Sequence, residues 1–190
     1  MYIDIFNTNK KYQIIYADPP WKYGSKKYQD GNRDFDKLEK NHYQTMTIPE
    51  LKKLPIKNII NKDAACFIWV TDSHLKEGIE VIESWSFKYK TIAFNWIKYY
   101  ESGKECVNFA PWTLKSWEIC LLGTRGTMGK YKKANNVRGL LKEIRTKHSK
   151  KPNETRRRIE MLFGDIPKIE LFARQKVEGW DCWGDEIETN

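Results

Sequence analysis

The tetrapeptide Asp18-Pro-Pro-Trp21 has the clearest chemical potential in this sequence. Each proline has a fixed φ and no N–H group, so the segment offers carboxylate and carbonyl acceptors on a stiff backbone. An exocyclic amine such as that of adenine has two N–H donors and a lone pair delocalised into its ring. If the Asp18 carboxylate and the Pro19 carbonyl each accept one hydrogen, the nitrogen is oriented toward an electrophile. The ring of Trp21 can then stack on the base.

The same four residues also have a structural interpretation. In that interpretation Asp18 ends a strand, Pro19 and Pro20 interrupt it, and Trp21 enters the hydrophobic core. The tetrapeptide alone leaves both interpretations open. Its position directly after the aliphatic run 14–17 is where open α/β sheets bind their ligands, beyond the carboxyl ends of the strands.

Elements that could position this site follow from the apolar pattern. Short runs rich in aromatic and β-branched residues predict five buried strands. These runs cover residues 14–17, 66–71, 91–97, 118–123 and 168–173.

Helix signals lie between the runs. A capping-box spacing at residues 47–50 predicts a helix start, and apolar residues repeat on one helical face over 75–82. A third helix is predicted between Pro152 and Gly164. Strands alternating with helices predict an α/β fold with a mostly parallel sheet and helices on both faces.

Length and composition limit the class of protein. The chain has 190 residues and 40% hydrophobic residues, including 8 Trp, 10 Tyr and 8 Phe, so we expect one globular domain over residues 1–190. The longest apolar run, 64–70, is far below the roughly 20 residues that span a bilayer. With no signal-peptide pattern at the start, a cytoplasmic protein without a membrane partner is expected. The four cysteines form no CxxC pair, so we expect core thiols and no metal.

Positive charge is concentrated in one segment. The net charge is +9, and residues 130–158 contain 12 Lys or Arg against 2 acids. Such a cluster is either a solvated face or a surface for a polyanion. Two stretches, 22–43 and 123–151, are longer than ordinary connections, and we expect them to be substrate or gate loops beside the site.

Further motifs follow the tetrapeptide in a fixed order. They are Tyr43-Gln-Thr-Met46, Ile68-Trp-Val-Thr71, Asn95-Trp-Ile-Lys98, Trp117-Glu-Ile-Cys-Leu-Leu-Gly123, Lys151-Pro152, Lys168-Ile-Glu-Leu-Phe-Ala-Arg174, Gly179-Trp180 and Gly184-Asp-Glu186. In this order, over nearly the whole chain, the sequence resembles the MT-A70-like family of Asp-Pro-Pro-Trp adenine N6-methyltransferases, in particular its small bacterial and phage members.

The resemblance implies a Rossmann-like fold that transfers a methyl group from S-adenosylmethionine to adenine N6. A compact chain without RNA-binding modules resembles the DNA enzymes, so DNA is the expected partner, and a homo- or heterodimer is possible within the family. The alternatives are an RNA adenosine N6-methyltransferase, a non-catalytic nucleic-acid-binding subunit, and an α/β domain that methylates small molecules or protein.

The base pocket implied by the resemblance consists of five residues. Asp18 and the carbonyl of Pro19 hold the target amine, and Pro20 and Trp21 complete the pocket. Tyr43 matches an aromatic residue of the first gate loop that packs on the base.

Four other positions match residues that bind S-adenosylmethionine in the family. Lys151 matches a lysine that meets the carboxylate of the cofactor, and Arg174 matches an arginine near its ribose. Asp185 and Glu186 match a polar pair that binds the ribose hydroxyls, although the family commonly has Asn where Asp185 stands. These acids would replace the glycine fingerprint of classical nucleotide sites, since the sequence has neither GxGxxG nor GxxxxGK[ST].

Overall fold

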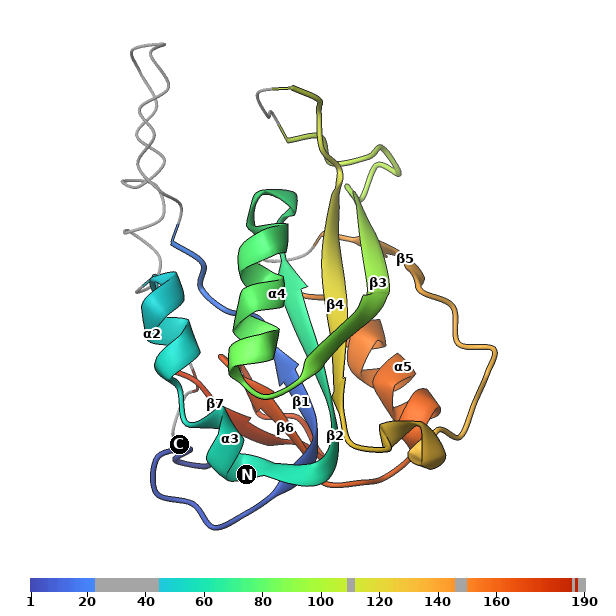
Figure 1. Cartoon of the computed structure of the whole chain (residues 1–190). Coiled ribbons are helices and arrows are strands. Elements are labelled where there is room, and N and C mark those ends of the chain that lie inside the picture. Colours follow the sequence, from blue (N-terminus) through green and yellow to red (C-terminus); the bar gives the residue numbers. More distant parts are fainter. Residues whose placement is uncertain (23–44, 109–111, 146–149, 186, 188–190) are drawn as a thin grey trace.

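The protein is described by a computed structural model that covers residues 1–22, 45–108, 112–145, 150–185 and 187 (Figure 1). In this part of the chain, seven strands form one sheet in the order β5-β3-β4-β2-β1-β6-β7. The strands are β1 (Tyr12–Ala17), β2 (Ile60–Val70), β3 (Lys88–Tyr99), β4 (Trp117–Arg125), β5 (Leu140–Ile144), β6 (Lys168–Leu171) and β7 (Asp181–Trp183).

The sheet is mixed, which corrects the expectation of a mostly parallel one. Strand β1 pairs in parallel with β2 and β6, β6 with β7, and β3 with β5. Strand β4 is antiparallel to both of its neighbours, β2 and β3. Parallel strands need a long crossover, usually a helix, whereas antiparallel strands can be joined directly. Between β3 and β4 the chain carries no helical pattern, so β4 runs back alongside β3.

All five predicted strands are present, and two strands were missed. Strand β5 and a short 3-10 turn at Met128–Tyr131 lie inside the stretch 123–151, which was predicted to be a loop. Only Leu141 of β5 is buried, because an edge strand has one neighbour. The sequence of β5 therefore lacks the apolar alternation that identifies strands. Strand β7 has three residues, too few to show a period.

The predicted helices are also present. The capping box precedes the first of them, where the Thr47 N–H donates to the Glu50 carboxylate over 2.7 Å. The last one ends at Gly164, whose φ of 73° is favourable for glycine. The helices are α2 (Ile48–Lys53), α3 (Ile56–Ile59), α4 (Leu75–Ser84) and α5 (Asn153–Phe163). None of the described helices could cross a membrane.

Helices cover both faces of the sheet, as predicted. Helices α2, α3 and α4 lie over one face and α5 over the other (Figure 1). Successive residues of β1 alternate between these two cores, because side chains of a strand point to opposite faces. Ile15 packs in the core with α4, whereas Ile14 and Tyr16 pack in the core with α5. Strand β1 is therefore buried on both faces, and it ends at Ala17, directly before Asp18.

Candidate active site

Three predicted site residues lie at one edge of the sheet. Ala17 at the end of β1 is in register with Leu171 of β6, which is in register with Trp183 of β7. Asp18, Arg174 and Asp185 follow these three parallel strands, so they emerge at the same carboxyl edge. Ligands of open α/β sheets bind at this edge.

The ends of β6 and β7 are held close together. Ala173 donates its N–H to the Trp183 carbonyl over 2.9 Å, and a Cβ on Gly184 would lie 2.4 Å from the Ala173 oxygen. Phe172 has a φ of 58°, which is rare for a bulky residue and tends to occur at functional sites. This tight, strained junction fixes the chain just before Arg174 and Asp185.

A buried chain of alternating charges lies beside the end of β1. The Lys151 Nζ lies 2.8 Å from Oδ1 and 2.9 Å from Oδ2 of Asp18, and 3.1 Å from Oε2 of Glu118. The ammonium of Lys98 forms an ion pair with the other oxygen of Glu118. The side chains of Lys151 and Asp18 are only 8% and 19% exposed. Two carboxylates thus compensate two ammonium groups, as burial of charge requires.

The pKa values of the two carboxylates in this cluster shift in opposite directions. Burial raises the pKa of Asp18, and the nearby charge of Glu118 adds to the effect, while Lys151 opposes it. Burial would also raise the pKa of Glu118, but the charges of Lys151 and Lys98 outweigh burial and lower it to about 2. Glu118 is therefore a fixed anion, whereas Asp18 accepts a proton more readily than an exposed aspartate.

Lys151 has partners that the sequence did not predict. Its ammonium contacts Asp18 and Glu118, and these carboxylates raise its pKa although burial opposes the charge. A contact with the carboxylate of S-adenosylmethionine stays a prediction.

Glu118 and Lys98 were not predicted as site residues. Both stand near the ends of strands, next to buried apolar positions, within the motifs Trp117-Glu-Ile-Cys and Asn95-Trp-Ile-Lys98. A charged residue in such a motif is the signal that could have identified them.

The tetrapeptide has features of both the structural and the chemical interpretation. Trp21 is 6% exposed within the core, where its indole N–H donates to the Trp69 carbonyl over 3.0 Å. Its ring also stacks on His74 at a centroid distance of 5.5 Å, so one face of the indole is occupied. The Pro19 carbonyl accepts the N–H of Trp21 over 2.9 Å, which leaves one of its two lone pairs. Trp21 is thus a packed residue, while Asp18 and Pro19 keep acceptor capacity.

The chain on both sides of residues 23–44 is fixed beside the tetrapeptide. Lys22 donates its N–H to the Met46 carbonyl over 3.1 Å, and Met46 donates to Pro20 over 2.8 Å. Tyr43 and Glu186, which the sequence placed in the base pocket and the cofactor site, lie outside the described residues. Their roles stay predictions.

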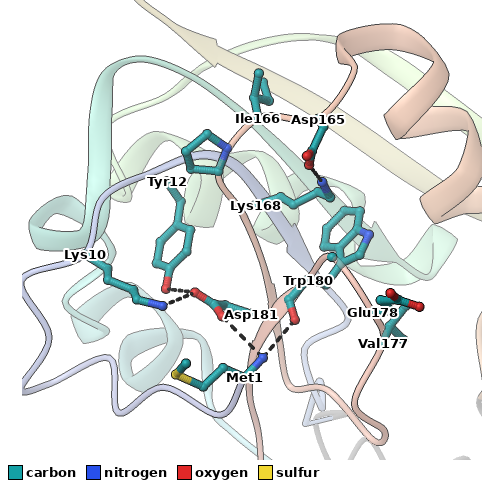
Figure 2. Close-up of a pocket in the computed structure, with 12 residues that line it drawn as sticks. Met1, Lys10, Tyr12, Asp165, Ile166, Lys168, Val177, Glu178, Trp180 and Asp181 are labelled. Atoms are coloured by element: carbon teal, nitrogen blue, oxygen red, sulfur yellow. Dashed lines mark hydrogen bonds and ion pairs between the residues drawn. The ribbon is translucent and has the colours of Figure 1, made fainter.

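A pocket of about 640 Å³ lies at the opposite, amino end of β1, β6 and β7 (Figure 2). Most of its charged groups are paired with each other. Asp181 accepts hydrogen bonds from Lys10 and from the Tyr12 hydroxyl, both over 2.8 Å, and Lys168 lies 2.7 Å from Asp165. This pocket is separate from the edge that holds Asp18. Within the described residues, no group of three or more His, Cys, Asp or Glu could hold a metal.

Comparison with known proteins identifies the family of this chain. The MT-A70 family model matches residues 12–186, and the chain belongs to the MT-A70 family, as its motifs predicted. It is 38% identical to the Type II methyltransferase M.MunI of Mycoplasma sp, over 95% of this chain and 80% of that protein.

Two further relatives are more distant. The N(6)-adenosine-methyltransferase subunit METTL3 of Danio rerio is 27% identical over 98% of this chain. The N6-methyladenosine RNA methyltransferase MTA1 of Cryphonectria parasitica is 24% identical over 93% of it. The chain spans only 30% of the length of METTL3 and 52% of that of MTA1.

Proposed function

We propose that this protein methylates the exocyclic N6 amine of adenine in DNA, with S-adenosylmethionine as the methyl donor. The observation that carries the proposal is the pair of oxygen acceptors, the Asp18 carboxylate and the Pro19 carbonyl, on a rigid backbone at the end of β1. These acceptors match the two N–H donors of the amine. Membership in the MT-A70 family supports the assignment.

In this proposal Asp18 orients the amine and then receives its proton. Lys151 contacts both oxygens of Asp18, and each oxygen has a further lone pair for a substrate N–H. When bound, S-adenosylmethionine supplies an electrophilic methyl group on a sulfonium. Methyl transfer would form an N–C bond as the C–S bond of the sulfonium breaks, with its electron pair kept on the sulfur of the departing thioether, and it would leave one excess proton on the nitrogen. Asp18 is suited to take that proton because burial raises its pKa. Glu118 keeps Lys151 in place with its fixed negative charge.

The cofactor would lie along the ends of β1, β6 and β7. Arg174 and Asp185 stand just after the adjacent strands β6 and β7, with Glu186 following in the sequence. A carboxylate accepts hydroxyl hydrogens, which suits Asp185 and Glu186 to a ribose. Arg174 and Lys151 supply positive charge near Asp18, and Lys151 is proposed to meet the cofactor carboxylate from its position on Asp18.

DNA is preferred over RNA because the chain spans 80% of a relative named as a Type II methyltransferase and only 30% of METTL3. The RNA alternative is favoured by the name of MTA1, an N6-methyladenosine RNA methyltransferase. In either polymer the adenine must leave its stack to reach Asp18. A non-catalytic subunit is disfavoured, since the acid and the aromatic residue of the tetrapeptide are both retained.

The test is methyl transfer from labelled S-adenosylmethionine to matched DNA and RNA oligonucleotides, followed by nucleoside analysis. We expect N6-methyladenine, with more product in DNA. Asp18→Ala should lower kcat by about 10²- to 10⁴-fold while cofactor affinity stays nearly unchanged. Asp165→Ala removes an exposed carboxylate at the other end of the sheet and should retain full activity. Turnover retained in Asp18→Ala would refute the assignment.

A further inference from the structure

The basic segment 130–158 is divided by the structure into cations that have internal partners and cations that do not. Five of its described cations form ion pairs with acids of the protein. The pairs are Lys130 with Asp63, Lys151 with Asp18, Arg156 with Glu170, and both Arg157 and Arg158 with Glu154. These charges are largely neutralised within the fold, so the whole segment does not act as one phosphate-binding surface.

The other described cations of this segment have no acidic partner within ion-pair distance. They are Lys132, Lys133, Arg138, Lys142, Arg145 and Lys150. Because they keep their full charge and are exposed or partly exposed, these six are the candidates for binding an external polyanion.

Two of the six lie far from the site. Lys132 and Lys133 follow the 3-10 turn after β4, and the N–H of Lys133 donates to the Leu162 carbonyl near the end of α5 over 2.7 Å. The end of β4, at Arg125, is in register with Ala64 in β2, well before the carboxyl end of that strand. Lys132 and Lys133 therefore belong to the edge of the sheet opposite Asp18, as the position of this turn in Figure 1 shows.

The remaining four lie in or next to β5 or directly before Lys151. Arg138 stands two residues before the start of β5. Lys142 lies in edge strand β5, and Arg145 extends that strand by donating its N–H to the Tyr99 carbonyl over 2.8 Å. Glu143 of β5 is in register with Lys98, a member of the buried charge cluster. Lys150 immediately precedes Lys151, which contacts Asp18.

We propose that Arg138, Lys142, Arg145 and Lys150, here called the β5 surface, bind the phosphates of the DNA strand whose adenine enters the site. This rests on the proposed function. Four cations with Glu143 as the one nearby acid of β5 are complementary to a polyanion. The neighbouring exposed side chains of Leu140 and Ile144 offer apolar contact to sugars or unstacked bases.

The test compares two double variants of the full chain that remove equal charge. Lys142→Gln with Arg145→Gln changes the β5 surface, and Lys132→Gln with Lys133→Gln is the matched control at the opposite edge. The dissociation constant of an adenine-containing oligonucleotide is measured from 50 to 200 mM salt. Loss of two phosphate contacts should reduce the slope of log K against log salt by about 1.4 for a single strand and about 1.8 for a duplex. Between 50 and 200 mM salt, the factor by which affinity falls should therefore be about 7 to 12 times smaller for Lys142→Gln with Arg145→Gln than for the unmodified protein.

The control should keep the slope of the unmodified protein. Equal changes in both double variants, or no change in either, would overturn the proposal. The same measurement is made with polyglutamate as the ligand. If Lys142→Gln with Arg145→Gln changes the salt slope for polyglutamate but not for the oligonucleotide, the proposal is overturned in favour of an acidic protein partner. Methyl transfer is measured separately. If the unmodified protein binds DNA at the β5 surface but does not methylate it, the proposed function is refuted while the phosphate-binding role of the β5 surface stands.

Discussion

Asp18 and Glu118 both contact Lys151, yet their pKa values shift in opposite directions. Glu118 lies between Lys151 and Lys98, and these two positive charges outweigh its burial. Asp18 has Lys151 as its ion-pair partner, and there burial has the larger effect. Residues of the same chemistry therefore differ in their charge: Glu118 is a fixed counter-charge, whereas Asp18 accepts a proton more readily than an exposed aspartate.

The low pKa of Glu118 predicts a pH dependence of stability. An acid whose pKa falls on folding adds stability above its unfolded value of 4.5 and loses it as the pH falls toward about 2. Glu118→Gln should therefore lower the free energy of unfolding at pH 7 by about 3 kcal/mol. The difference from the unmodified protein should shrink between pH 4.5 and pH 2. Urea unfolding at several pH values measures both effects.

Glu80→Gln is the control for this measurement. Glu80 is paired with Lys52 at the surface, where both side chains are more than a third exposed, so its loss should change stability little. A Glu118→Gln variant with the same pH dependence as the unmodified protein would contradict the charge cluster.

Helix α5 is the element that connects the charge cluster to the sheet. It begins at Asn153, directly after Lys151 and Pro152. Arg156 in its first turns donates to both oxygens of Glu170 in β6, over 2.7 and 2.6 Å, and both side chains are below 10% exposed. The buried pair fixes the start of α5 and with it the position of Lys151.

Arg156→Met should destabilise the protein by about 3 to 5 kcal/mol, because it leaves the buried Glu170 without its partner. Arg157→Met is the neighbouring control. Arg157 is 63% exposed, and its loss should cost less than about 0.5 kcal/mol. Urea denaturation of both variants measures the difference. Equal losses in the two variants would mean that Arg156 does not anchor α5.

At the scale of the whole molecule, the sheet separates two hydrophobic cores that cover both of its faces. All four cysteines are unpaired and buried, which confirms the prediction of core thiols. Cys66 in β2 faces the core under α4, and Cys120 in β4 faces the core under α5. Burial raises the pKa of both thiols, which keeps them in the unreactive protonated form.

These thiols can therefore report on global unfolding. In the native protein at neutral pH, Cys66 and Cys120 should not react with an alkylating reagent, and all four cysteines should react in denaturant. Mass spectrometry of timed samples measures the labelling of each residue. Rapid native labelling of Cys66 or Cys120 would mean that the central strands open without global unfolding.

The amino-acid sequence by itself determined the positions of five strands, the helix that starts at Thr47 and the helix that ends at Gly164. The expected burial was wrong for one strand, since only Phe94 and Trp96 are buried in the run 91–97. Local patterns encode these elements: an apolar period, a capping side chain and a glycine that tolerates positive φ. The sequence also placed Asp18 at the end of a strand, because a stiff proline pair directly follows an aliphatic run.

Only the tertiary structure decided the direction of β4, the presence of β5 and the partners of Lys151. Strand direction depends on how the chain returns between strands, and an edge strand such as β5 has little burial to mark it. Glu118 and Asp18 are 100 positions apart in the sequence, yet both contact Lys151. Contacts between distant positions, and the pKa shifts that burial causes there, exist only once the sheet has formed, so no local pattern of residues encodes them.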